Sequence, residues 1–368
     1  MTRTLILGGR EIVIEALRHP LDEAFDRLHA AYFGDTPLAW DEFEAVALQY
    51  FTNNAGSTAA HDAYFNNFTV IWRNLLDAGR YDHAERLWQQ ALQPALRWEE
   101  ANPNQRLHKG TPYYFWSMTV LLRGDIDQGY LLIHQAVDED IRTSGQRTPD
   151  TPGYALVSLN YQRVDQAFRQ WVIAQAQFLS DLLTNYTTTH TRTLTLSDVK
   201  QRFLDRPPGK ETIFLLTYTL ARLMKLAALP LHTTKNPFAG QLQLNLLFGM
   251  TLVIDTAIKA KNNTKWKFID HAEHLLTTVG APLSNQELGE INGQFNNNFD
   301  ATLAAALDGT LAITYRALNR LQCDVALAYG LRNHGAHNTG TAGTMWNRFT
   351  EVQQALFRAF FATIDHLY

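Results

Sequence analysis

The chain has 368 residues, of which 46% are hydrophobic and 18% are charged. This composition excludes an intrinsically disordered protein, and the length is enough for two domains with buried cores. The formal net charge of −4 is unevenly distributed, with an acidic excess in residues 1–194 and a mild basic excess in residues 195–368. Frequent Leu, Ala and Gln, together with scarce strand-like alternation, predict an all-α protein.

Cysteine content and hydropathy limit the class of protein further. Cys323 is the only cysteine, which excludes an internal disulfide and a cysteine-rich zinc site, and its apolar surroundings predict a buried side chain. The apolar stretch within residues 1–10 is too short for a secretory signal or a membrane span. The most apolar internal segment, residues 213–231, contains Arg222 and Lys225 and is typical of a buried helix. We therefore expect a cytoplasmic protein with no membrane segment.

The first half of the chain contains a faint repeat, in which residues 79–91 and residues 124–136 share a pattern. In each copy a glycine is followed by a large apolar residue, a small residue and apolar residues at helical spacing. We expect the glycine to end one helix in a left-handed conformation. We expect the small residue, Ala84 or Gly129, to let two helices approach closely.

This pattern resembles the second helix of tetratricopeptide-type repeats, over about residues 60–143. The resemblance implies a region of helical hairpins that binds a protein or a small-ligand regulator. Two ordinary helical hairpins account for the same residues equally well.

Polar segments interrupt the middle of the chain. Residues 143–153 have the composition of a loop, a long helix is predicted for residues 156–186, and a polar run follows to residue 195. We place the domain boundary at that run, although the long helix suits either side. The result is a helical repeat-like interaction or regulatory domain, residues 1–190, and a second helical domain, residues 191–368.

The second domain is predicted to be a succession of helices. Ser284 and Glu287 have the spacing of a capping box at one helix start. The predicted helices span residues 210–229, 240–259, 265–278, 286–307, 311–331 and 344–367.

A polar motif precedes the last predicted helix. Arg332, Asn333 and His337 form the pattern R-N-x-x-x-H. Cleaving RNA without a metal requires removing a proton from the ribose 2′-hydroxyl, protonating the leaving oxygen and balancing the negative charge that develops on phosphate. Histidine titrates near neutral pH and suits the proton transfers, whereas the planar, always charged guanidinium suits the phosphate oxygens. On a helix or a helix-turn we expect the arginine and the histidine to lie close to one face.

The motif and its setting resemble the HEPN superfamily, and the resemblance covers the C-terminal half. It implies a helical bundle, a homodimer whose two motifs share one cleft, and an endoribonuclease that leaves a 2′,3′-cyclic phosphate and a 5′-hydroxyl. By this resemblance Arg332 binds the scissile phosphate of single-stranded RNA, His337 acts as acid or base, and Asn333 positions one of them. His334 lines the cleft, and Asp255 is the candidate acidic partner of Arg332. The resemblance implies a defence or toxin role and no cofactor or metal.

Other interpretations of the same residues stay open. The HEPN-like half is alternatively a non-catalytic module for dimerisation, in an adaptor whose N-terminal helices bind a partner. The motif is alternatively a chance match, with Arg332 in a salt bridge and His337 hydrogen-bonded in a core. His271 and His274 have helical spacing but lack further zinc ligands, so we expect an exposed helix face there. The lysines within residues 259–267 form either a cluster that attracts phosphate backbones or a solvated loop without a partner.

Overall fold

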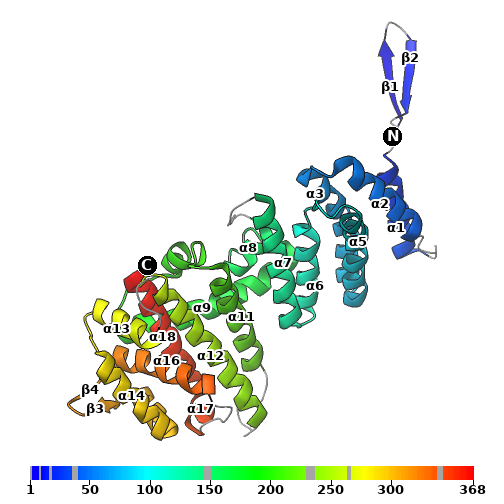
Figure 1. Cartoon of the computed structure of the whole chain (residues 1–368). Coiled ribbons are helices and arrows are strands. Elements are labelled where there is room, and N and C mark those ends of the chain that lie inside the picture. The colour runs from blue at the N-terminus through cyan, green and yellow to red at the C-terminus, as the bar shows by residue number, and fades with distance from the viewer. Residues whose placement is uncertain are drawn as a thin grey trace. The chain divides into compact units, whose positions relative to one another are not determined.

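The structure is a computed structural model that describes residues 2–7, 10–15, 19–34, 40–144, 151–228, 237–262, 267–337 and 343–368. Helices make up most of these residues, which confirms the all-α prediction (Figure 1).

The chain divides into two compact units, Met1–Thr148 and Pro149–Tyr368. The division differs from the predicted boundary after residue 190, because the long helix α9 (Arg169–His190) packs on helices α11 (Lys210–Ala227) and α18 (Phe349–Leu367). That helix therefore belongs to the second unit.

The first unit consists of one strand pair and a series of helices. Strands β1 (Thr2–Leu7) and β2 (Arg10–Glu15) pair in antiparallel register, a hairpin that the sequence analysis did not predict. The helices that follow are α1 (Pro20–Phe33), α2 (Trp40–Asn54), α3 (Thr58–Asn66), α4 (Phe68–Asp77), α5 (Tyr81–Ala101), α6 (Gly110–Leu122) and α7 (Ile126–Ser144).

Large aromatic side chains fill the core between these helices, and many of their rings meet edge to face. Such pairs add stabilisation beyond the apolar area that they bury. The central rings, each at most 4% exposed, are Phe43, Phe51, Tyr64, Phe65, Phe68, Trp72 and Trp88.

The predicted repeat has the same local structure in both copies. Gly79, with φ +67°, follows α4, and Gly124, with φ +92°, follows α6, so both glycines adopt the left-handed conformation. The backbone amide of the residue after each glycine donates to a backbone carbonyl of the preceding helix, from Arg80 to Leu75 and from Asp125 to Val120. A Cβ built at Gly129 would lie 2.4 Å from the side chain of Leu121. The predicted helix ends, and the close approach at Gly129, are confirmed.

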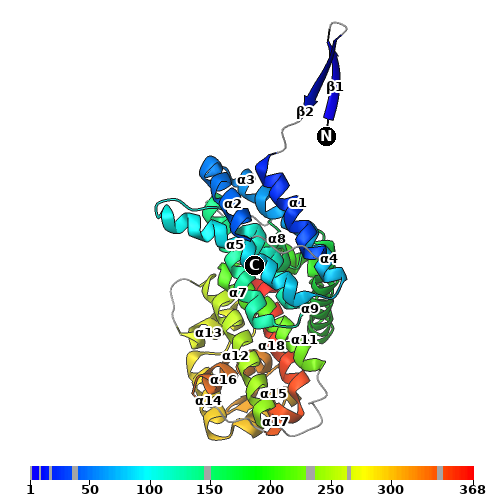
Figure 2. The ribbon, with the colours of Figure 1, turned by 90° about the vertical axis from the view of Figure 1, so that its right-hand side faces the viewer.

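The second unit is a helical bundle around α18, whose side chains are buried almost continuously from Val352 to Ile364. Helices α12 (Pro237–Lys259) and α16 (Arg320–His337) pack side by side with α18 (Figures 1 and 2). The other elements are α8 (Pro152–Val157), η1 (Gln166–Phe168), α10 (Leu196–Val199), η2 (Lys200–Leu204), α13 (Phe268–Thr278), α14 (Asn285–Asn297), α15 (Phe299–Asp308), β3 (Ala312–Ile313), β4 (Arg316–Ala317) and α17 (Gly343–Asn347).

Four predicted helices of this unit differ from the observed ones. The span 344–367 breaks at Arg348, between α17 and α18. The span 156–186 breaks after α8, where Leu159 has a φ of +56°. The span 286–307 breaks at Asn298, whose side chain caps α15 by accepting from the amide of Ala301. The span 311–331 begins instead with the β3–β4 hairpin. Helix α16 starts later because Asn319 and Gln322 exchange side-chain hydrogen bonds with each other's amides. The predicted capping box of Ser284 and Glu287 is confirmed.

Within the part of the chain that the structure describes, one helix segment is long and apolar enough to cross a membrane. This segment, Gly240–Lys259, has a mean hydropathy of 1.3, and 56% of it is buried. It packs against α11, α16 and α18, which is the environment of a core helix in a bundle.

Candidate functional site

The motif residues lie on the last two turns of α16, which continues through His337. Arg332, Asn333 and His334 are partly exposed. The backbone of His337 is helical, but its side chain lies outside the described residues. Since a helix turns about 100° per residue, Asn333 and His337 share one face, whereas Arg332 lies about 140° around from His337. The expectation that Arg332 and His337 lie close to one face of a helix is therefore wrong, because α16 stays helical through both residues.

Arg332 lacks a carboxylate partner, unlike several other arginines of the second unit. Its side chain is partly exposed, and its Nε, like that of Arg169, is buried without a hydrogen-bond partner. No ion pair joins Arg332 to a carboxylate among the described residues. By contrast, a carboxylate partner is present for Arg192, Arg316, Arg320, Arg348 and Arg358. A buried N–H donor without an acceptor is costly. A ligand reaches the exposed part of the Arg332 side chain rather than this buried atom.

Neighbouring polar groups hold the position of Asn333. Its Nδ2 donates to the Oδ1 of Asn292 on α14 at 2.8 Å. Burial raises the pKa of Tyr329 above its ordinary value, although a hydrogen bond with Asn333 and the charge of Arg332 act in the opposite direction. Tyr329 therefore stands beside both motif residues. Tyr329 precedes Arg332 by three residues and Asn333 by four, a helical spacing that is visible in the sequence. Nothing in the sequence points to Asn292.

Helices α14 and α15 support this end of α16 through aromatic contacts. The ring of His334 stacks on Phe299 with centroids 3.8 Å apart and planes inclined by 24°. A Cβ built at Gly330 would lie 2.5 Å from the ring of Phe295, so the absence of a side chain at this position lets α14 and α16 approach closely. This approach brings Asn292 within reach of Asn333.

Asp255 has a different partner from the predicted one. Its Oδ1 lies 2.5 Å from the Nδ1 of His271 on α13, and the side chain of His271 is fully buried. The physical reason is that a buried imidazole needs a hydrogen-bond partner, which α12 supplies. The structure thus assigns Asp255 to His271 rather than to Arg332. The expectation that His271 lies on an exposed face is wrong.

A buried charge network that the sequence analysis missed connects α9, α16 and α18. Asp324 is fully buried, and Arg358 binds its two carboxylate oxygens at 2.8 and 2.6 Å. Arg320 and His190 contact the same carboxylate, each at 3.1 Å. Asp324 and Arg358 each interrupt an apolar helical stretch of the sequence, and this pattern could have indicated a buried ion pair. This network fixes the helix that carries the motif against α18.

Metal and thiol chemistry find little support in the described residues. Among them, no group of three or more His, Cys, Asp or Glu side chains is arranged to hold a metal ion. Cys323 is buried as predicted, and burial raises the pKa of its thiol to about 11. Such a thiol is not a nucleophile at neutral pH.

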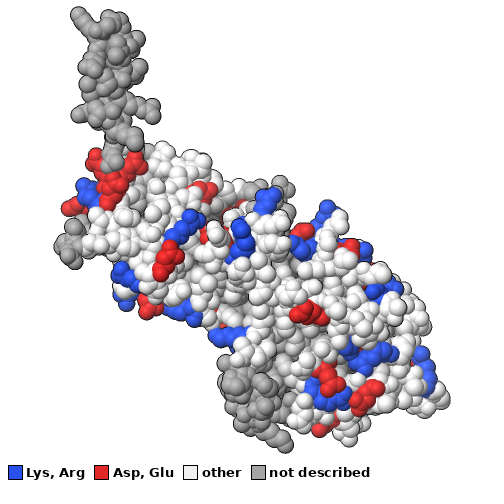
Figure 3. All heavy atoms as spheres, turned by 180° about the vertical axis from the view of Figure 1, so that it is seen from behind, with Lys and Arg blue, Asp and Glu red and all other residues white. Residues whose placement is uncertain are grey.

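Charge alone does not define a binding surface on the face shown in Figure 3. On the described part of this face, basic and acidic side chains are interspersed. A function must therefore be argued from particular groups of residues rather than from a large region of one sign.

Comparisons with known proteins give no match for this chain. No family model matches the sequence, no curated protein is significantly similar to it, and no solved structure is significantly similar in fold. The function is consequently argued from the chemistry of the site itself.

Proposed function

We propose that the chain is a metal-independent endoribonuclease of the HEPN class that cleaves single-stranded RNA as a homodimer in the cytoplasm. The observation that carries the proposal is the partly exposed side chain of Arg332, which lies beside Asn333 at the end of α16 and has no carboxylate partner among the described residues. A phosphate oxygen is an acceptor of the right charge for a guanidinium. The defence or toxin role follows from the same resemblance.

The chemistry assigns one task to each motif residue. Arg332 binds the non-bridging oxygens of the scissile phosphate and balances the charge that develops there. A base takes the proton of the ribose 2′-hydroxyl, whose oxygen then bonds to phosphorus. The bond from phosphorus to the 5′-oxygen breaks, and an acid protonates that oxygen. A 2′,3′-cyclic phosphate and a 5′-hydroxyl result.

A homodimer supplies both the acid and the base. A single imidazole of one protonation state does not act as base and acid in the same step. Two copies of His337, one from each protomer, fill both roles in a shared cleft. Asn333 lies one turn before His337 on the same helix face, and its bond to Asn292 fixes its side chain. Its proposed task is to position the imidazole or the phosphate.

The proposal is tested by incubating the full chain with labelled single-stranded RNA in excess EDTA. We expect cleavage, and a loss of at least about 100-fold in rate for Arg332→Ala and for His337→Ala. Matched controls are Arg86→Ala, an exposed arginine of the first unit, and His274→Ala on α13, both of which should cleave as the unaltered chain does. Equal loss in the controls, or full activity in both motif variants, contradicts the proposal.

A second candidate function, partner binding by the first unit, is favoured by its two matching hairpins and by exposed apolar side chains. Leu131 on α7 is 73% exposed and Val70 on α4 is 57% exposed. In this alternative the chain is a non-catalytic adaptor that dimerises through its second unit. Two results together support this alternative: the chain is inert towards RNA, and it captures a specific protein. The variant Leu131→Asp should abolish that capture, whereas Arg332→Ala should leave it unchanged. A chain that cleaves RNA and captures no such protein rules it out.

A further inference from the structure

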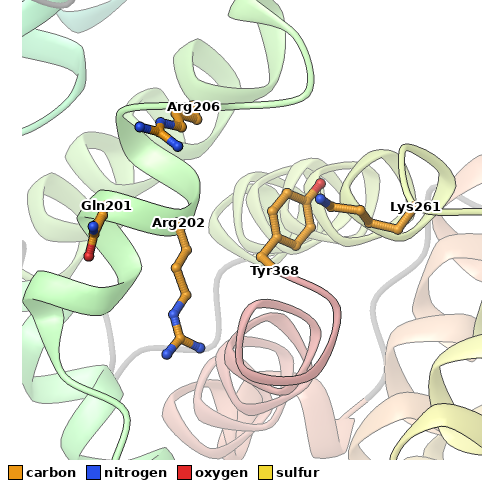
Figure 4. A pocket seen from close by; sticks show the side chains of 5 residues that line it. All are labelled: Gln201, Arg202, Arg206, Lys261 and Tyr368. Carbon is orange, nitrogen blue, oxygen red and sulfur yellow. The ribbon is translucent and has the colours of Figure 1, made fainter.

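A pocket with a cationic lining lies at one end of the second unit, where three segments of the chain meet. Its volume is about 400 Å³, and its lining comprises Gln201, Arg202, Arg206, Lys261 and Tyr368. Gln201 and Arg202 belong to η2, Arg206 follows it, Lys261 follows α12, and Tyr368 follows α18. Figure 4 shows the two arginines on one side of the pocket and the lysine with the tyrosine on the other.

The charged side chains in this lining all have the same sign. Three of the five described lining residues are cationic and none is acidic. Two carboxylates lie near these cations. The exposed Asp205 is close enough to Arg206 for that charge to act on its pKa, and the Oδ1 of Asp198 lies 3.8 Å from Arg202, with both side chains about one third exposed. An exposed pair at that distance neutralises little charge. Cations gathered around one cavity repel each other, and an anion between them relieves that repulsion.

Lys261 is held in place without losing its charge. Its Nζ lies 4.1 Å from the centroid of the Tyr368 ring, in a cation–π contact. The hydroxyl of Tyr368 donates to the backbone carbonyl of Ala257 at 2.9 Å, which fixes the ring. Because the ring carries no net charge, this contact positions the ammonium group but does not neutralise it. The full positive charge remains for a ligand.

We propose that this pocket binds a small molecule with a phosphoryl group and at least two negative charges. The planar guanidinium groups of Arg202 and Arg206 match pairs of phosphate oxygens, and Lys261 adds a point charge from the opposite side. Gln201 offers an amide to the uncharged part of the ligand. A volume of about 400 Å³ lies within the range of small-molecule sites and exceeds what a lone phosphate needs.

The pocket is separate from the proposed cleavage site. The described partners of the motif residues include Asn292 on α14, Phe299 on α15 and Tyr329 on α16. The pocket is instead lined by η2 and by residues that follow η2, α12 and α18. None of these partners lines the pocket. A ligand in the pocket leaves the position of Arg332 free.

Isothermal titration calorimetry of the full chain with pyrophosphate, at about 0.1 M salt, tests the proposal. We expect one site per chain and a loss of about tenfold or more in affinity for Arg206→Gln and for Lys261→Gln. The matched control Arg86→Gln changes the net charge equally, lies in the other unit and should bind as the unaltered chain does. All three side chains are exposed, so the variants should keep the melting temperature of the parent.

Three outcomes overturn the proposal. The first is no binding of pyrophosphate, or binding that Arg206→Gln and Lys261→Gln leave unchanged. The second is equal binding of citrate, which shows an anion site without preference for phosphate. The third is single-stranded RNA bound through these residues while pyrophosphate is not, which makes the pocket part of an RNA surface. Arg332→Ala should bind pyrophosphate normally, so this result is independent of the ribonuclease test.

Discussion

Arg332 and a lysine in its place carry the same charge but differ in shape. A guanidinium presents a planar fork to two phosphate oxygens, whereas an ammonium is a point charge. If the guanidinium of Arg332 binds phosphate as a planar fork, Arg332→Lys should lower the cleavage rate by about 100-fold despite the retained charge. Initial rates on labelled RNA measure this, with Arg86→Lys as the matched control. A rate within about threefold of the parent for Arg332→Lys contradicts the role of the fork.

A second residue-scale prediction concerns Asp365 at the end of α18. Burial pushes its pKa upwards, but hydrogen bonds from Arg192 at 2.6 Å and Tyr186 at 2.9 Å outweigh burial and hold the pKa below its ordinary value. A lowered folded-state pKa means that the carboxylate stabilises the fold above its unfolded pKa of about 4, and that this contribution is lost as pH falls through the folded-state pKa.

Asp365→Asn should therefore lower the free energy of unfolding by about 1 kcal/mol at pH 7, and the difference from the parent should shrink below about pH 4. Urea denaturation at a series of pH values measures this. Asp181→Asn serves as control and should show no such pH dependence, because Asp181 is exposed on α9 and accepts from the neutral side chain of Gln177. A difference that grows on acidification would falsify the assignment.

At the scale of elements, the Asp324 network determines how α16 sits against α18. Asp324→Asn leaves Arg358, whose side chain is 6% exposed, without its anionic partner. An uncompensated buried charge costs about 3–5 kcal/mol. We expect that loss in the unfolding free energy of the second unit, measured by urea denaturation. Asp308→Asn is the matched control, since it breaks the more exposed pair with Arg348 and should cost about 1 kcal/mol or less. If the two variants lower the unfolding free energy equally, the Asp324 network does not hold α16 against α18.

The same scale shows what local sequence signals predict. Helix ends depend on neighbouring residues, so the glycines after α4 and α6 and the capping box of Ser284 were predictable. The break at Asn298 and the late start of α16 depend on side chains that accept backbone hydrogen bonds, which apolar periodicity does not detect. The strand pair β1–β2 has six residues in each strand, too few for apolar alternation to stand out in the sequence.

The candidate site was predictable in part for a similar reason. Arg332, Asn333 and His334 are contiguous, so the sequence places them together at one end of α16. Asn292 comes from another helix, and its contact with Asn333 depends on how α14 packs at Gly330. The pairing of Asp255 with His271 rather than Arg332 likewise depends on tertiary packing.

At the scale of the whole molecule, the central claim requires two chains. A cleft built from two copies of His337 loses activity when the protomers separate. We expect the cleavage rate per chain to fall on dilution in parallel with the dimer fraction, measured by light scattering on the same samples. Arg332→Ala should remain dimeric. Constant activity per chain in a purely monomeric sample contradicts the shared cleft, while leaving the proposed phosphoryl pocket untouched.

The chemistry of the RNA ends tests the central claim most directly. Mass spectrometry of the fragments formed in EDTA should find a 2′,3′-cyclic phosphate on one side of each cut and a 5′-hydroxyl on the other. His337→Ala should form neither. Fragments with 5′-phosphate and 3′-hydroxyl ends, or the same cyclic products from His337→Ala, contradict the account.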